Sequence, residues 1–187
     1  DMKKSTEFNL RQILEIRNQD LVRMAMLSES TISMDEHLCW IKKMLAKNDY
    51  SGFLLVNDLG QTVGLIELQN IDLQNKIADW AIMLSGDSPN GLGAIVEYRF
   101  IDFVFSGNTE IFKLCCRVLS SNQSVIKLHK KFGFIEEGVL RSHVLRDGRR
   151  INIHLLGILR DEWLECRGII GKRIEVFFDK FDVAFEL

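Results

Sequence analysis

The stretch DWAIMLSGDSPNGLGA, residues 79–94, decides how this chain folds. Its first half reads as a strand, and the glycines at Gly91 and Gly93 precede apolar residues with helical spacing. Glycine lets the backbone turn tightly, so that successive N–H groups can point at an anion at the positive end of the next helix. The stretch therefore predicts a strand, a turn and a helix that can cradle a phosphate, although most Gly-x-Gly turns are only turns.

Composition limits the class of protein. The chain has 187 residues, 47% of them apolar and 27% charged, which is typical of one globular domain that buries its own core. Net charge is −2 with acidic and basic residues intermixed, which argues against binding to nucleic acid. Apolar runs stay below the roughly 18 residues that a membrane helix needs. We expect a cytoplasmic protein that has no secretory leader and does not bind a membrane.

The four cysteines, Cys39, Cys115, Cys116 and Cys166, lack the C-x-x-C spacing of many metal and redox sites. Cys115 and Cys116 are adjacent in a strand-like run, so their side chains should face opposite sides of the strand. These cysteines are typical of small core residues in a reducing compartment. We therefore expect no metal ion in the protein.

Periodicity of the apolar residues predicts alternating helices and strands. The order is that of a mixed α/β fold, with helices between strands and an antiparallel hairpin near the end. In chain order, the expected elements are a helix from residue 9 that breaks near Asn18, a capped helix over 35–47, strands over 53–56, 62–68 and 77–84, a helix over 92–105, a strand over 111–119, a helix over 122–132, and strands over 134–145 and 151–159.

The tail is interpreted separately. Apolar residues alternate at Ile174, Val176 and Phe178, which is the period of a strand. We expect a main domain over residues 1–167 and an extension over 168–187 that forms an extra edge strand, a hairpin or part of a homodimer contact.

The order of elements and a second motif resemble the GNAT family of acetyl-CoA-dependent N-acetyltransferases. The resemblance implies a central mixed, mostly antiparallel sheet flanked by helices. That family's second motif reads Asn-x-x-Ala/Ser-x-x-Leu-Tyr-x-Lys-x-Gly-Phe. The chain matches it about 30 residues after the glycine turn, at Asn122, Leu128, Lys131, Gly133 and Phe134.

Two positions depart from the family pattern. Ser88 stands where the first motif has a glutamine or arginine, so we do not expect the side-chain contact to the pyrophosphate that the family pattern implies at that position. His129 replaces the tyrosine that often protonates the leaving thiolate. An imidazole has a reference pKa near 6.5 and can donate a proton or a hydrogen bond at neutral pH, so His129 is the candidate general acid. Alternatively, its ring simply packs beside Leu128.

A narrower resemblance covers about residues 7 to 165. The segments 14–18 and 32–40 (LEIRN and ISMDEHLCW) look like the amino-terminal part of N-acetyltransferases that modify a UDP-linked 4-amino-4,6-dideoxy sugar in pseudaminic acid synthesis. Residues 138–141, 146–149 and 161–163 are similar to the carboxyl half of that group. The resemblance implies a nucleotide-sugar acceptor.

The family resemblance also implies where acetyl-CoA, the co-substrate, binds. It would lie in the opening between the strand around Ile82 and Met83 and the strand ending near Leu119. Strand backbone groups would pair with the pantetheine arm and stabilise the oxyanion, turn N–H groups would hold the pyrophosphate, and an asparagine would hold the pantetheine from the other side. The expected contacts are the strand residues Ile82, Met83 and Leu84, the turn residues Asn90, Gly91, Leu92, Gly93 and Ala94, and Asn122.

Acetyl transfer needs a neutral amine, because an ammonium ion has no lone pair to attack the thioester. A carboxylate or imidazole must take its proton, and Glu67 and His37 are the candidates. The alternatives are a solvated strand carboxylate and a histidine on a helix face. For a UDP-sugar acceptor, Arg17, Asn18, His37 and Trp40 are the expected contacts, with Arg17 and His37 on phosphate and Trp40 stacking on a ring.

Other functions stay open at this point. The nearest alternatives within the fold acetylate a ribosomal or other protein amino terminus, or a polyamine. A polyamine enzyme should line its acceptor cleft with acids, whereas the expected acceptor residues include Arg17 and His37. A third alternative is a non-catalytic domain that binds acetyl-CoA and regulates another process.

Overall fold

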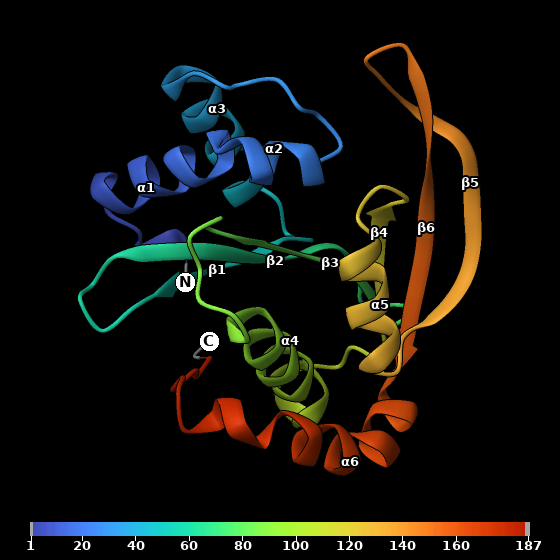
Figure 1. Ribbon diagram of the computed structural model, residues 1–187. Coiled ribbons are helices and arrows are strands. Elements are labelled where there is room, and N and C mark those ends of the chain that lie inside the picture. Colours follow the sequence, from blue (N-terminus) through green and yellow to red (C-terminus); the bar gives the residue numbers. More distant parts are fainter. Residues whose placement is uncertain (1, 186–187) are drawn as a thin grey trace. The chain divides into compact units, whose positions relative to one another are not determined.

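The structure is a computed structural model that describes residues 2–185 (Figure 1). Its strands form a mixed six-stranded sheet in the order β1-β2-β3-β4-β6-β5, which helices flank, as the sequence predicts. In chain order the elements are η1 (Met2–Lys4), α1 (Glu7–Asn18), α2 (Asp20–Ala25), α3 (Met34–Leu45), β1 (Ser51–Val56), β2 (Thr62–Asp72), β3 (Ile77–Leu84), α4 (Leu92–Phe103), η2 (Val104–Asn108), β4 (Lys113–Leu119), α5 (Gln123–Lys131), β5 (Ile135–Arg146), β6 (Arg149–Leu159) and α6 (Arg160–Phe178).

The described chain forms two compact units. The first contains residues 2–71 and 79–88, and the second contains residues 72–78 and 89–185. The two units differ in charge. The first carries 11 acidic and 8 basic residues, a net charge of −3, whereas the second carries 13 acidic and 16 basic residues, a net charge of +3.

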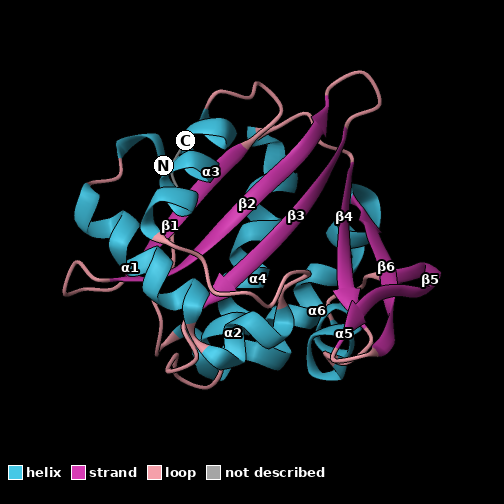
Figure 2. Cartoon of the chain, turned by 90° about the horizontal axis from the view of Figure 1, so that it is seen from above, coloured by secondary structure: helices cyan, strands magenta, loops and turns pink. Residues whose placement is uncertain are grey.

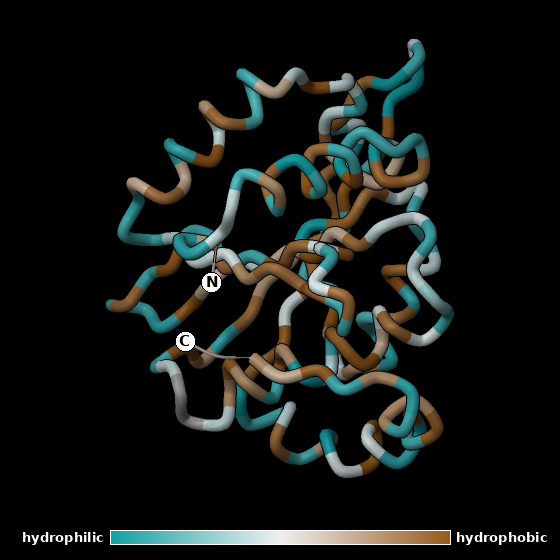
Figure 3. The backbone as a smooth tube through the Cα atoms, turned by 90° about the vertical axis from the view of Figure 1, so that its left-hand side faces the viewer, coloured by the Kyte–Doolittle hydropathy of each residue, from teal (hydrophilic) through white to brown (hydrophobic). Residues whose placement is uncertain are grey.

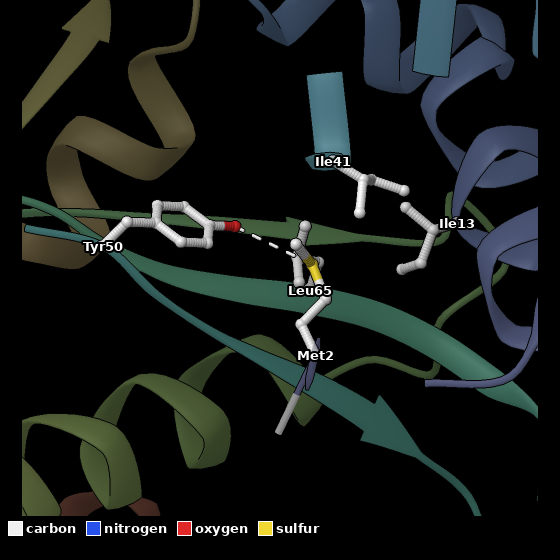
Figure 4. Close-up of a cluster of buried hydrophobic side chains, with 5 residues drawn as sticks. All are labelled: Met2, Ile13, Ile41, Tyr50 and Leu65. Carbon is white, nitrogen blue, oxygen red and sulfur yellow. Dashed lines mark hydrogen bonds between the residues drawn. The ribbon is translucent and has the colours of Figure 1, made fainter. Parts of the chain in front are cut away.

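In the first unit, capping boxes begin two helices. Thr6 and Asn9 cap α1, and Ser33 and Glu36 cap α3 as the sequence predicts. β1 pairs antiparallel with β2, so the predicted hairpin is confirmed. A buried cluster joins the helices to these strands (Figure 4); its members are Met2, Ile13, Ile41, Tyr50 and Leu65.

In the second unit, β4, β6 and β5 are antiparallel neighbours. The β5–β6 hairpin turns at Asp147 and Gly148, whose φ angles of 46° and 74° suit a tight hairpin turn (Figure 2). α6 packs along α4, where Trp163 is fully buried, contacts the ring of Tyr98 at 5.1 Å and donates a hydrogen bond to Asp102. These contacts fix the helix that follows the glycine turn.

The prediction of a strand or hairpin after residue 167 is wrong. Residues 168–178 continue α6 through Gly168 and Gly171, and residues 179–185 form no strand. Trp163, Ile170 and Ile174 are buried at helical spacing, while Val176 is 65% exposed, so the alternating residues Ile174 and Val176 lie on opposite sides of a helix. In Figure 3 hydrophilic and hydrophobic segments alternate every few residues along the helices. Residues 186–187 of the extension lie outside the described residues.

Candidate active site

The glycine turn begins α4 as predicted. Gly91 is the N-cap of α4 with φ 96° and ψ −18°, in the left-handed region where glycine is favoured. Its carbonyl accepts a hydrogen bond from the N–H of Ile95. Within the described residues, no backbone carbonyl accepts a hydrogen bond from the N–H of Gly93 or Ala94. Two donors at the positive end of a helix therefore meet the requirement for holding a phosphate.

The end of α6 lies against this turn. A Cβ atom at Gly91 would stand 2.4 Å from the ring of Phe177, which is closer than side chains approach one another. Gly91 is thus required by its backbone conformation and by the space that Phe177 occupies. The sequence did not reveal this contact. Of the other turn residues, Asn90 is exposed and Leu92 is buried, so Leu92 can offer a ligand only its backbone.

The backbone of β3 presents alternate residues to opposite sides. The N–H of Ser85 donates to the carbonyl of Val63 on β2, so residues of the same parity, including Met83, also face β2. Ile82 and Leu84 therefore direct their backbone N–H and C=O groups away from β2. Of the three strand residues expected to contact acetyl-CoA, these two have the geometry for pairing with a ligand.

Asn122 begins the second motif. It is the N-cap of α5, and its Oδ1 accepts hydrogen bonds from the N–H of Val125 and the hydroxyl of Ser124. The asparagine of the motif thus has a local structural role in starting the helix. Its amide nitrogen is the group that a pantetheine carbonyl would need.

His129 lies inside the second unit, bonded to a residue that the sequence analysis missed. Its Nδ1 is 2.7 Å from Oε1 of Glu97, and the two residues are only 3% and 1% exposed. Its ring also contacts Phe134 at 5.2 Å. Burial raises the pKa of Glu97, and the charge and hydrogen bond of His129 oppose that increase. His129 is therefore part of a buried acid–base pair, and it does not simply pack against an apolar neighbour.

Glu67 is held by a tyrosine in the first unit. Tyr50 Oη donates a 2.6 Å hydrogen bond to Oε1 of Glu67, and the same hydroxyl points toward the sulfur of Met2 (Figure 4). Burial raises the pKa of Glu67, while hydrogen bonds from Tyr50 and Gln69 oppose the increase. Burial and the adjacent Glu67 also raise the pKa of Tyr50, so its hydroxyl remains a donor. A solvated strand carboxylate is thus the wrong description of Glu67.

Arg17 and Asn18 contact the loop between α2 and α3. Arg17 Nη2 donates to the carbonyl of Ser28, and its pKa is lowered by burial and then by the charge of Arg23. The Asn18 side chain donates to the carbonyl of Ile32 and accepts from its N–H. Asn18 therefore clamps this loop and has a structural role that the sequence analysis did not predict.

His37 and Trp40 lie on one face of α3 as expected. His37 is only 2% exposed, and its Nε2 is 3.0 Å from the carbonyl oxygen of Leu10, which it can contact only as a donor. Burial lowers the pKa of His37, so the neutral ring is favoured. Its ring stacks on that of Trp40 with centroids 6.1 Å apart. These contacts favour the interpretation of His37 as a buried structural residue over that of a base or a phosphate contact.

The family comparison matches residues 2–155 to the acetyltransferase (GNAT) domain. The chain belongs to the GNAT family. It is 24% identical over 157 residues to spermidine N(1)-acetyltransferase of Vibrio cholerae serotype O1, covering 83% of this chain and 90% of that protein. It is also 24% identical over 130 residues to YokL, a prophage-derived N-acetyltransferase of Bacillus subtilis (strain 168), covering 66% of this chain and 70% of that one.

Solved structures of the family share the fold. A crystal structure of the Vibrio cholerae spermidine N-acetyltransferase in complex with CoA and spermine superimposes with a TM-score of 0.78 at 23% identity, covering 86% of this chain and 95% of that one. A dodecameric form of the same enzyme has a TM-score of 0.70 at 24% identity, covering 83% and 91%. Like other GNAT acetyltransferases, the chain is an acyltransferase that uses acetyl-CoA.

None of the helices in the described part of the chain is both long and apolar enough to cross a membrane. In the same residues, no three histidine, cysteine, aspartate or glutamate side chains gather into a group that could hold a metal ion.

Proposed function

We propose that this GNAT enzyme transfers the acetyl group of acetyl-CoA to a primary amine of a polyamine. The observation that carries the proposal is Glu67, a half-buried carboxyl that Tyr50 holds in place and whose pKa is raised by desolvation. A carboxylate can attract an ammonium ion and then accept its proton, and a raised pKa makes it a stronger base near neutral pH.

Charge supports a cationic acceptor. The unit that contains Glu67 carries a net charge of −3, which favours the approach of a polycation over that of a nucleotide. The sequence argument against a polyamine depended on Arg17 and His37 facing the acceptor. His37 is buried and contacts the carbonyl of Leu10, so the structure withdraws one of these two residues from the acceptor. The similarity to spermidine N-acetyltransferases points to the same class of acceptor.

In the proposed reaction, Glu67 takes a proton from the acceptor ammonium, directly or through a water molecule. The neutral nitrogen attacks the thioester carbon, and a backbone N–H of Ile82 or Leu84 stabilises the oxyanion of the tetrahedral intermediate. The C–S bond then breaks, and His129 donates a proton to the CoA thiolate as it leaves. One N–C bond forms and one C–S bond breaks. The nitrogen loses two protons, the first to the Glu67 carboxylate and the second to water as the tetrahedral intermediate collapses, and the departing sulfur gains one proton from His129.

Acetyl-CoA would use contacts on both motifs. The N–H groups of Gly93 and Ala94 have the geometry for the pyrophosphate, and they need no side chain at Ser88. The backbone N–H and C=O groups of Ile82 and Leu84 point away from β2 and can hydrogen-bond the pantetheine arm, which would lie beside β3 like a short strand. The Asn122 amide nitrogen would donate to a pantetheine carbonyl.

A thiol-release assay with acetyl-CoA tests the acceptor. The panel contains spermidine, spermine, a UDP-4-amino sugar and a short peptide with a free amino terminus. We expect turnover with the polyamines, and a loss of about 10²-fold or more in kcat for Glu67→Gln. Asp58→Asn makes the same chemical change at an exposed turn of the same unit and should leave kcat unchanged. Turnover confined to the peptide or the sugar would reject the polyamine proposal.

One observation favours the UDP-amino sugar as a second candidate. Arg17 Nη1 is buried and has no hydrogen-bond partner among the described residues, so it can still receive an acceptor phosphate. Arg17→Ala should then raise the KM for the UDP-sugar and leave the KM for spermidine unchanged. An equal change in both KM values would remove this support.

A further inference from the structure

Glu97 on α4 and His129 on α5 come from different motifs of the sequence and meet in the interior of the second unit. Their side chains are 2.7 Å apart, and both are almost completely buried. We infer that Glu97 is a positioning residue that accepts a hydrogen bond from the Nδ1–H of His129 and thereby keeps the transferable proton on Nε2. The inference rests on the proposed role of His129 as the general acid.

Glu97 lies on the buried, apolar side of α4, where an unpaired carboxyl would destabilise the fold. Its neighbours Ile95, Val96, Phe100 and Ile101 are all buried apolar residues, so an aliphatic side chain would suit the same site. A buried carboxyl instead costs several kcal/mol unless it is paired. His129 is the ionisable group whose charge and hydrogen bond change the pKa of Glu97, so the imidazole is the partner of this carboxyl.

Two features favour an ionised Glu97 beside a protonated ring. The charge and the hydrogen bond of His129 lower the pKa of Glu97 against the effect of burial. His129 also lies in the last turn of α5, where the helix dipole favours a positive charge. An ionised carboxylate can only accept a hydrogen bond, so Nδ1 must then be the donor.

The chemical consequence concerns which atom acts. With Nδ1–H bonded to Glu97, an imidazolium has one remaining N–H, on Nε2, and this is the proton given to the thiolate. A partner that fixes the ring also fixes the direction of that N–H bond. Glu97 would therefore act through His129 and have no contact with acetyl-CoA.

The ring nitrogens of His129 can be read directly by NMR of the 15N-labelled full chain, with His129→Phe used to assign the signals. We expect Nδ1 to carry a proton throughout the pH range in which the protein is folded. In Glu97→Gln the Nδ1 signal should change, whereas Glu175→Gln, at an exposed position on α6, should leave it unchanged. An unprotonated Nδ1 in the unaltered protein would overturn the inference, because Glu97 would then be the donor.

Kinetics supply the second test. Glu97→Gln should lower kcat about ten- to a hundredfold, since it removes part of a general-acid contribution of about 10²–10⁴-fold, and it should leave the KM for acetyl-CoA unchanged. Combined with His129→Phe it should cause no further loss, because the two residues act as one unit. Losses that multiply in the double variant would contradict a role through His129.

The two proposals can fail separately. If spermidine and spermine are not acetylated, the proposed acceptor is wrong, and the kinetic comparison is made with whichever amine of the panel reacts. The NMR measurement needs no acceptor, so it decides the tautomer of His129 whatever the result with polyamines.

Discussion

The hydrogen bond from Tyr50 to Glu67 gives a quantitative prediction. It favours the ionised carboxylate, so Tyr50→Phe should raise the pKa of Glu67 above its already raised value. A hydrogen bond to a charged group contributes about 1.5–3 kcal/mol. One pKa unit corresponds to about 1.36 kcal/mol, so the full effect is about 1–2 units. Gln69 still donates to Glu67, and we therefore expect about one unit.

The assay is kcat/KM for a polyamine as a function of pH. Glu67 must be ionised to accept a proton, so activity is lost as the pH falls through its pKa, and the acidic limb should move to higher pH by about one unit in Tyr50→Phe. Tyr98→Phe removes the hydroxyl that donates to the Arg167 carbonyl in the second unit and serves as the matched control. An acidic limb that stays in place in a folded Tyr50→Phe protein would refute Glu67 as the base.

Three further predictions concern the turn, the loop clamp and pH-dependent stability. Gly91→Ala should lower the free energy of unfolding by about 1–3 kcal/mol and weaken acetyl-CoA binding. Adding Phe177→Ala to this variant should recover part of both losses, because it removes the clash. Urea unfolding measures the stability and calorimetry measures the binding. Asn18→Ala should lose about 1–3 kcal/mol through its two bonds to Ile32 without changing the Kd for acetyl-CoA. Folding raises the pKa of Glu67, so the protonated Glu67 stabilises the fold fully at pH values below the pKa of the unfolded state. That contribution is lost as the pH rises through the pKa of the folded state. In Glu67→Gln the fall in the free energy of unfolding above about pH 4 should therefore be smaller.

Local patterns explain why most elements could be predicted. β3 has the bounds Ile77–Leu84 that the sequence indicated, because an apolar run stops at a glycine turn. The Ser33 and Glu36 spacing marked the start of α3, where both hydrogen bonds of the capping box form. In each case the signal and the structure involve residues only a few positions apart.

The tail could not be assigned in the same way. Ile174, Val176 and Phe178 fit a strand, while Trp163, Ile170 and Ile174 fit a helix. The choice depends on burial against α4, where Trp163 donates to Asp102 from 61 residues away. Such a contact leaves no sign in the local pattern.

Glu97 was missed for a related reason, although a signal existed. It is a charged residue on the apolar side of the helix predicted over 92–105, and a buried charge needs a partner. The sequence alone does not say that the partner is His129, 32 residues further along. Glu67 was selected from the chemistry of the reaction, but its contact with Tyr50 was likewise invisible.

The two acid–base pairs have opposite tasks in one turnover. Glu67 must begin ionised and end protonated, whereas His129 must begin protonated and end neutral. The nitrogen loses one proton to Glu67 and one to water, and the thiolate gains one from His129, so neither pair is reset by the chemical step itself. Glu97 and His129 are buried and Glu67 is half-buried, which slows proton exchange with water. Proton exchange after product release is therefore a step that can limit kcat, and a solvent isotope effect on kcat larger than that on kcat/KM would identify it.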